Sequence, residues 1–263
     1  MSRFEQPEHR ARKRFGQNFL EDSGVISAIG NAISPQPNDH IVEIGPGLGA
    51  LTSELIGRAK QLTLIELDRD LLPKLEQKFN RQAAWSILSA DALEVDFSEL
   101  AGSSQIRVVG NLPYNISTPL IFHLLEYAER ILDMHFMLQK EVVLRLTAKP
   151  GTGAWGRLSL MVQYFCETEF LLEVPPEAFN PQPKVVSAVV RLTPRTPPYP
   201  AKDLYQLELV IKTAFAQRRK TLRNTLKSMF DTKQLIELGI DPGARAETLS
   251  LEQYVNLSNS LEP

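Results

Sequence analysis

The stretch Ile41-Val42-Glu43-Ile44-Gly45-Pro46-Gly47-Leu48-Gly49 decides the fold class. Its first four residues are typical of a strand, glycines follow at alternate positions, and residues 50–59 have the pattern of a helix. Glycines let the backbone turn tightly and approach a ligand, with the amino terminus of the next helix pointing at it. The spacing differs from the Gly-x-Gly-x-x-Gly of dinucleotide-binding proteins, and the Lys-Ser/Thr of a phosphate-binding loop is absent. Alone, this loop is weak evidence for a nucleotide-like ligand.

Two further predicted strands end on acidic residues. Residues 62–65 lead to Glu66, about twenty residues beyond the first glycine, where an acidic residue commonly holds ribose hydroxyls. Residues 85–90 lead to Asp91, which can accept a hydrogen bond from an adenine amino group or from nearby backbone. Helix capping or surface solvation is the structural alternative for each of these carboxylates, and Asp91-Ala92-Leu93-Glu94 resembles a capping box. Polar groups at the carboxyl ends of successive strands indicate a ligand site at that edge of the sheet.

A fourth predicted strand, Ile106 to Gly110, leads to Asn111-Leu112-Pro113-Tyr114. The Asn111 amide oxygen and the Leu112 carbonyl can both accept hydrogen bonds from one exocyclic amino group, and the Tyr114 ring can stack on its heterocycle. Pro113 fixes its own φ and restricts the residue before it, so these acceptors are held in place before substrate arrives. An ordinary turn would also use Asn and Pro.

Composition predicts a cytoplasmic, globular protein without a metal. The chain has 263 residues, of which 43% are hydrophobic and 23% charged, and its net charge is −2. No apolar run is long enough to span a membrane, and the amino terminus lacks the apolar core of a signal peptide. The single cysteine, Cys166, lies in an apolar run and cannot form an internal disulfide, and the four histidines lack ligand spacing.

Two basic clusters interrupt this mildly acidic chain. One comprises Arg10, Arg12, Lys13 and Arg14, and the other extends from Lys212 to Lys227 without an acidic residue. A solvated helix face is the usual explanation of a charge run, but phosphate contacts are the simplest use for two acid-free clusters. The sequence therefore favours a nucleic-acid partner.

Prolines at residues 194–200 predict an extended linker between two domains. Residues 1–193 form the predicted α/β domain, and residues 201–263 have helical periodicity, as in Leu204, Leu207, Val210, Ile211 and Ala214. The segment Gly151 to Gly156 has the composition of a mobile loop.

The glycine loop at residues 43–49, Glu66, Asp91 and the segment Asn111 to Tyr114 resemble the ordered motifs of S-adenosylmethionine-dependent methyltransferases. The form Asn-Leu-Pro-Tyr resembles that of enzymes that methylate an exocyclic amino nitrogen. Three more segments narrow the resemblance to ribosomal RNA adenine dimethyltransferases of the bacterial small-subunit type: Lys13 to Leu20, Phe179 to Ser187, and Ala214 to Asn224. The resemblance covers nearly the whole chain. It implies a Rossmann-like α/β methyltransferase domain followed by a small all-helical C-terminal domain.

The resemblance also implies roles for individual residues. Glu66 would hold the cofactor's ribose, Asp91 its adenine end, and Gly45 and Gly47 would pass beside its methionine part. The full implied cofactor set is Gln17, Asn18, Leu20, Gly45, Gly47, Glu66, Asp91 and Asn111. The implied catalytic set is Asn111, Leu112, Pro113, Tyr114 and Phe179. The implied RNA-binding set is Arg218, Arg219, Lys220 and Arg223.

In that set Tyr114 and Phe179 would be the aromatic faces around the target base. A core aromatic braced by prolines is the alternative for Phe179.

The implied substrate is 16S ribosomal RNA in a partly assembled 30S subunit, where two adjacent adenosines of a hairpin loop near the 3′ end would each receive two methyl groups on N6. We expect a monomer, because the partner is large. Three alternatives stay open. They are methylation of 23S ribosomal RNA or of adenine in DNA, a non-catalytic assembly or transcription factor with this fold, and a small-molecule amine methyltransferase. The last would leave the second domain and the basic clusters without a role.

Overall fold

The computed structural model describes residues 17–261, which divide into two compact units. The first unit contains the described residues up to Lys140 together with Phe170–Thr193. The second contains Glu141–Glu169 and the chain from Pro194 onward. The amino-terminal basic cluster and the first half of the Lys13-to-Leu20 motif lie outside the described residues.

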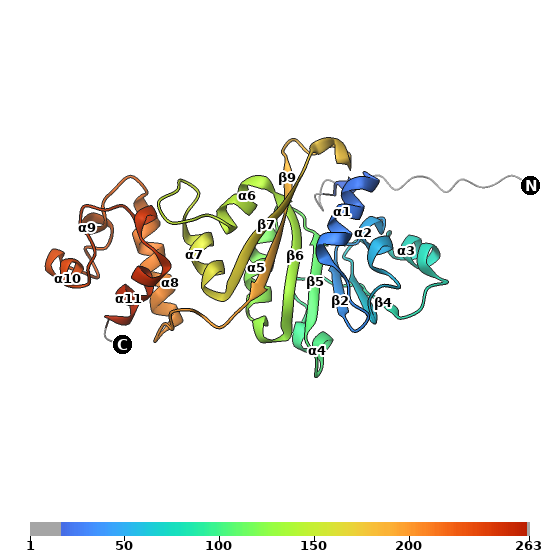
Figure 1. Ribbon diagram of the computed structural model, residues 1–263, viewed down its shortest axis with the longest axis horizontal. Coiled ribbons are helices and arrows are strands. Elements are labelled where there is room, and N and C mark those ends of the chain that lie inside the picture. The colour runs from blue at the N-terminus through green and yellow to red at the C-terminus, as the bar shows by residue number, and fades with distance from the viewer. Residues whose placement is uncertain (1–16, 262–263) are drawn as a thin grey trace, which may run out of the picture. The chain divides into compact units, whose positions relative to one another are not determined.

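A seven-stranded sheet in the order β4-β3-β2-β5-β6-β9-β7 organises the first unit (Figure 1). Its first five strands are parallel, and β9 runs antiparallel to β6. The strands are β2 (His40–Ile44), β3 (Gln61–Ile65), β4 (Trp85–Leu88), β5 (Ile106–Asn111), β6 (Ile131–Gln139), β7 (Cys166–Val174) and β9 (Ser187–Pro194). The chain moves from β2 to β3 and β4 on one side and returns to β5 on the other, so the order reverses between β2 and β5. Ligands of open α/β sheets bind at such a switch point.

The helices of this unit confirm the predicted alternation of strand and helix. They are α1 (Ser23–Ile33), α2 (Ala50–Leu55), α3 (Leu72–Phe79), α4 (Phe97–Ala101) and α5 (Ser117–Leu125), with the 3₁₀ turns η2 (Ala128–Arg130) and η3 (Pro176–Ala178). Asp22 caps α1 by accepting from the Val25 N–H at 2.8 Å. The predicted helix at residues 50–59 ends earlier, at Leu55. The capping alternative for Asp91 is wrong, because the next helix begins only at Phe97, where Asp96 is the cap.

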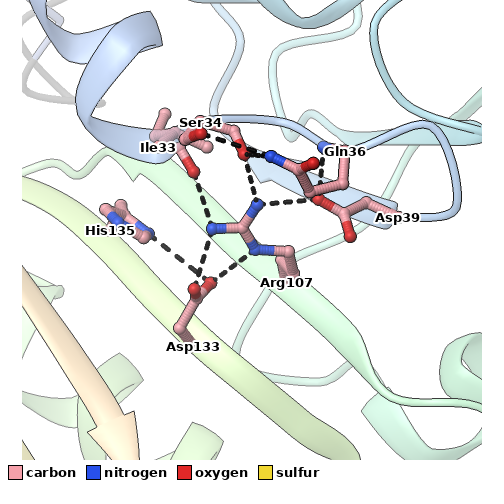
Figure 2. Close-up of polar contacts among 7 residues, drawn as sticks. All are labelled: Ile33, Ser34, Gln36, Asp39, Arg107, Asp133 and His135. Atoms are coloured by element: carbon pink, nitrogen blue, oxygen red, sulfur yellow. Dashed lines mark hydrogen bonds and ion pairs between the residues drawn. The ribbon is translucent and has the colours of Figure 1, made fainter.

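A buried arginine holds the amino end of β5 against its neighbours (Figure 2). Arg107 is 7% exposed, and its guanidinium lies 2.7 Å from an Asp39 carboxylate oxygen and 2.8 Å from one of Asp133. It also donates to the Ile33 carbonyl at the end of α1, at 2.7 Å. Because the charge is paired on both sides and hydrogen bonded, its burial is tolerated. The sequence showed a charged residue inside an otherwise apolar strand here, but not the partners of that residue.

The second unit has its own apolar core. Its helices are α7 (Arg157–Phe165), α8 (Leu204–Ala214), α9 (Leu222–Thr225), α10 (Thr232–Glu237) and α11 (Leu251–Asn259), with η4 (Phe215–Gln217), η5 (Ala246–Thr248) and, from Glu141 on, most of α6 (Lys140–Leu146). Leu160 and Tyr164 of α7 pack in one cluster with Leu207 and Tyr254. Residues 141–169 therefore group with the C-terminal helices, which differs from the sequence-based division at residue 193. Their apolar side chains complete a core that residues 201–263 share.

The loop from Gly151 to Gly156 is tied down within the second unit. The Gly151 N–H donates to the Glu247 carbonyl at 2.7 Å. Trp155 is 2% exposed, and its indole N–H donates to the Leu249 carbonyl at 2.9 Å. These contacts contradict the mobility that the glycines suggested, because a buried tryptophan anchors the segment.

Within residues 17–261, no helix is long and apolar enough to cross a membrane. The same residues contain no group of three or more His, Cys, Asp or Glu side chains arranged to share a metal ion.

Candidate active site

A cavity with about 1400 Å³ of space free of protein atoms, part of it open solvent, lies at the carboxyl ends of the parallel strands. Its walls come from the loops that follow β2, β3, β4 and β5 and from the segment around β1 (Phe19–Leu20). The lining includes the predicted residues Gln17, Asn18, Leu20, Gly45, Gly47, Glu66, Asp91, Asn111, Leu112, Pro113 and Tyr114. The structure thus brings together residues from segments far apart in the sequence, at the switch point of the sheet.

The glycine loop adopts a backbone that other residues rarely take. Gly45, Gly47 and Gly49 have φ values of +66°, +59° and +73°. An added Cβ at Gly47 would lie 3.1 Å from the Phe19 ring, so the loop and the β1 segment are in close contact there. Glycine at these positions allows the loop to follow the cavity wall without strain.

Glu66 braces this loop with one carboxylate oxygen and the turn after β3 with the other. Oε2 accepts from the Gly47 N–H at 3.2 Å, and Oε1 accepts from the Asp68 N–H at 2.8 Å. Burial raises the pKa of Glu66, although the N–H groups of Asp68 and Gly47 oppose this shift. Each oxygen keeps a lone pair that can accept a hydrogen bond from a ribose hydroxyl.

Asp91 and Leu67 provide a polar group and an apolar surface on the same cavity. Asp91 Oδ1 accepts from the Leu93 N–H at 3.0 Å and so closes a turn, while its carboxylate still lines the cavity. Leu67 is 48% exposed and also lines it. An exposed apolar side chain beside an acceptor suits a flat heterocycle with an amino group.

A hydrogen bond to the Asn18 backbone fixes the orientation of the Asn111 amide. Its Nδ2 lies 3.0 Å from the Asn18 backbone carbonyl, which can only accept, so the amide nitrogen must face it. Oδ1 is therefore the atom on the other side of the amide, in a residue that lines the cavity. An acceptor held in this way suits recognition of an N–H group on the substrate.

The residues after Asn111 form a turn that leads into α5. The Leu112 N–H donates to the Met137 carbonyl at 3.2 Å, and the Ile116 N–H donates to the Pro113 carbonyl at 3.2 Å. The Tyr114 hydroxyl lies 2.8 Å from Ser187 Oγ on β9, so the ring is held at its far end. The tyrosine thus lines the cavity as a fixed aromatic group.

Phe179 lies elsewhere. It is 3% exposed, does not line the cavity, and belongs to the core cluster of the first unit. Its short strand β8 (Phe179–Asn180) pairs antiparallel with β1, with Phe179 opposite Leu20. The structure thus places Phe179 in the core, as the alternative of a core aromatic has it, and its role as a face of the target base stays a prediction.

Sequence reasoning assigned no role to two buried polar residues of the cavity lining. Burial raises the pKa of Glu43 to about 7, and the Thr52 hydroxyl donates to its carboxylate at 2.6 Å. His135 is 2% exposed, and its Nδ1 lies 3.5 Å from an Asp133 oxygen, too far for a good hydrogen bond (Figure 2). A polar residue inside an apolar strand was the available signal in both cases.

The predicted RNA-binding residues of the second unit are exposed. Arg218, Arg219 and Lys220 lie in the loop between η4 and α9, and Arg223 lies on α9. The Arg218 guanidinium donates to the Gly153 carbonyl. The cluster presents positive charge to solvent, as a phosphate-binding surface requires.

The cavity residues fit S-adenosylmethionine. The glycine backbone leaves space where side chains would otherwise stand, Glu66 offers acceptors to a ribose, and Leu67 with Asp91 suits an adenine ring. A Rossmann-like sheet with these groups at its switch point is typical of the class of S-adenosylmethionine-dependent methyltransferases.

Comparison with known proteins places the chain within that class. The family model for ribosomal RNA adenine dimethylase matches residues 8–262, and the chain belongs to this family. A relative from Saccharophagus degradans, "Ribosomal RNA small subunit methyltransferase A", is 60% identical over 97% of this chain and 96% of that protein. A protein of the same name from Pseudomonas aeruginosa is 57% identical over 97% and 96%.

Two solved structures share the fold. A dimethyladenosine transferase from Plasmodium falciparum superposes with a TM-score of 0.78 at 24% identity, covering 91% of this chain and 95% of that one. The 23S rRNA methyltransferase ErmE superposes with a TM-score of 0.75 at 29% identity, covering 92% and 98%. The predicted fold class and cofactor are confirmed by the family and the solved structures that this chain matches.

Proposed function

We propose that this chain transfers methyl groups from S-adenosylmethionine to N6 of two adjacent adenosines in a hairpin loop near the 3′ end of 16S ribosomal RNA, within the small subunit or its precursor in the cytoplasm. The Asn111 amide, fixed by the Asn18 carbonyl, carries the proposal, because it presents an acceptor where an exocyclic amine must be held. The names of the relatives that are 57–60% identical support the small-subunit substrate.

Bound S-adenosylmethionine supplies an electrophilic methyl group. The protein must then place the lone pair of the substrate nitrogen in line with that methyl group. Adenine N6 is a poor nucleophile, because its lone pair is delocalised into the ring. Hydrogen bonds from its two N–H groups to Asn111 Oδ1 and to the Leu112 carbonyl would favour a pyramidal, more nucleophilic nitrogen. Stacking on Tyr114 would hold the adenine ring. This is positioning and electrostatic stabilisation without a titrating general base.

The base must leave its stack to enter the cavity, so an unpaired loop is the expected target. The exposed cluster Arg218, Arg219, Lys220 and Arg223 would contact the RNA backbone. We expect the chain to act as a monomer on the assembling subunit.

The test is methyl transfer from labelled S-adenosylmethionine to small subunits that lack the modification, followed by digestion of the RNA to nucleosides. Recovery of N6,N6-dimethyladenosine is the expected result. Absence of transfer with retained subunit binding would favour a non-catalytic assembly factor. In a parallel assay on unmodified large-subunit RNA, transfer there and not to small subunits would favour the activity in the name of ErmE, to which this chain is 29% identical.

A further inference from the structure

The last turn of α3 packs against the glycine loop, although α3 contributes nothing to the predicted cofactor site. A Cβ added at Gly49 would lie 2.7 Å from the Phe79 ring, so this ring rests directly on the loop backbone. Gly49 is the N-cap of α2 and has no side chain with which to cap it. The end of the loop therefore depends on groups from α3 for its support.

Lys78, beside Phe79, donates to two consecutive carbonyls of the loop. Its Nζ lies 3.0 Å from the Leu48 oxygen and 2.8 Å from the Gly49 oxygen. The same ammonium lies 5.2 Å from the centroid of the Phe79 ring, within range of a cation–π contact. The aliphatic stem is thereby held in one place, and the charged group reaches across 30 residues of sequence to the loop.

Holding these carbonyls also fixes the N–H groups of the loop. In a trans peptide the N–H points away from the C=O, so a donor on the Leu48 and Gly49 oxygens orients the N–H groups of Gly49 and Ala50. Leu48 and Ala50 both line the cavity. The Ser53 hydroxyl also donates to the Gly49 oxygen, at 2.7 Å, but that hydrogen bond is neutral. The hydrogen bonds from Lys78 are charge-assisted and therefore stronger in kind.

We propose that Lys78 is a positioning residue of the cofactor site, which clamps the carbonyls of Leu48 and Gly49 and so shapes the glycine loop for S-adenosylmethionine. This role rests on the proposed function of the loop. Lys78 itself touches no reacting atom, so it sets the affinity for the cofactor and leaves the chemical step alone.

The test compares Lys78→Gln and Lys78→Arg with the wild-type chain, with Arg81→Gln as the control. Arg81 is exposed and lies three positions further along the chain. Binding of S-adenosylhomocysteine is measured by calorimetry, and KM for S-adenosylmethionine and kcat are measured on unmodified small subunits. Loss of a charge-assisted hydrogen bond is expected to raise Kd and KM about tenfold in Lys78→Gln. The value of kcat at saturating cofactor should stay at the wild-type level.

Lys78→Arg keeps the donor and the charge, so it should recover most of the affinity, and Arg81→Gln should bind as the wild type does. Unchanged binding by Lys78→Gln, or a loss of kcat without a change in KM, would overturn the proposal. A general folding defect would lower the melting temperature and the affinity for RNA as well. The proposed role of Lys78 predicts that both stay at the wild-type level, so a drop in both would count against it. If the wild-type chain bound no S-adenosylhomocysteine, the proposed cofactor site itself would fail, and with it this role.

Discussion

At the scale of residues, the site depends on one hydrogen bond between segments far apart in the chain. Asn18 and Asn111 are separated by 93 positions, yet the carbonyl of one sets the orientation of the other's amide. The acceptor that we assign to the target amine is thus prepared by a segment that precedes the first helix.

Asn111→Ala is expected to lower kcat by about 10²–10³-fold, as for the loss of a preorganised hydrogen-bonding group at a reacting centre. Asn111→Asp keeps an acceptor but places a carboxylate against the Asn18 carbonyl, so it should also lose activity. Both variants should retain the small subunit in filter-binding assays. Full activity of Asn111→Asp would show that the amide orientation is unimportant.

Glu43 makes stability depend on pH. Burial raises its pKa from an ordinary 4.5 to about 7; the nearby carboxylate of Glu66 adds to this shift, whereas the hydrogen bond from Thr52 and the charge of Lys78 oppose it. A raised folded-state pKa means that the folded chain keeps a proton that the unfolded chain has lost. The stability is therefore full below about pH 4.5 and falls as pH rises toward 7, in total by on the order of 3 kcal/mol.

Glu43→Gln removes this titration while keeping an acceptor for the Thr52 hydroxyl. We expect its free energy of unfolding, measured with urea and without cofactor, to exceed that of the wild type at pH 8. The two chains should converge near pH 5. A difference that does not change with pH would contradict the assignment.

The residue-level site was predictable only in part. Glu66, Asp91 and Asn111 could be grouped from sequence, because parallel strands that follow one another end at the same edge of a sheet. The contact of Lys78 with the loop and the partners of Arg107 could not. They depend on distances between side chains from separate elements, which hydrophobic periodicity does not encode. Phe179 shows a different limit, since the motif resemblance assigns it to the site whereas its ring packs in the core of the first unit.

At the scale of elements, β2 and β5 approach each other more closely than an ordinary side chain would permit. Gly110 pairs with Ile44, and an added Cβ at Gly110 would lie 2.5 Å from the Ile44 carbonyl oxygen. The two strands carry the glycine loop and Asn111 at their carboxyl ends. Their spacing therefore sets the distance between the cofactor side and the substrate side of the cavity.

Gly110→Ala must separate these strands or distort β5. Overpacking of this kind typically costs about 1–3 kcal/mol of stability, and we expect activity to fall as well, because Asn111 is the next residue. Gly153→Ala is the matched control, since an added Cβ there meets nothing within 4 Å. Equal urea midpoints for the two variants would contradict this account.

The strands themselves were well predicted, and their helices less so. The β-branched runs before Glu66 and Asn111 are strands in the structure. The predicted helix at residues 50–59 is shorter because Ile56 already has extended backbone. Helix ends depend on local capping, which the apolar pattern does not report.

At the scale of the whole molecule, the exposed cluster of the second unit should carry electrostatic affinity for RNA. Replacement of Arg218, Arg219 and Lys220 by Gln is expected to weaken binding to the small subunit. It should also reduce the slope of log K against log salt by about 0.7–0.9 for each phosphate that the variant no longer neutralises. Lys233→Gln is the control, because Lys233 is exposed but lies 3.5 Å from the Glu237 carboxylate. An unchanged slope would mean that the cluster is only a solvated surface.

The division into units was only partly visible in the sequence. The prolines at residues 194–200 mark one boundary, and the second unit resumes at Pro194. Nothing in the sequence marked residues 141–169 as part of the second core. Their apolar side chains would serve equally in either unit, and only the packing of Trp155, Leu160 and Tyr164 decides between them.

The burial of Trp155 in the second core means that each unit contains one tryptophan as an intrinsic fluorophore. The chain has two tryptophans, and the other, Trp85, lies in β4, where its indole donates to the Phe79 carbonyl at 3.1 Å. Tryptophan emission from a Trp85→Phe chain would arise from the second unit alone, and tryptophan emission from a Trp155→Phe chain from the first unit alone. Coincident denaturation curves would mean that the two cores unfold as one cooperative system, and separate curves that each folds on its own. Quenching of Trp85 on addition of cofactor would likewise report events in the first unit without interference from the second.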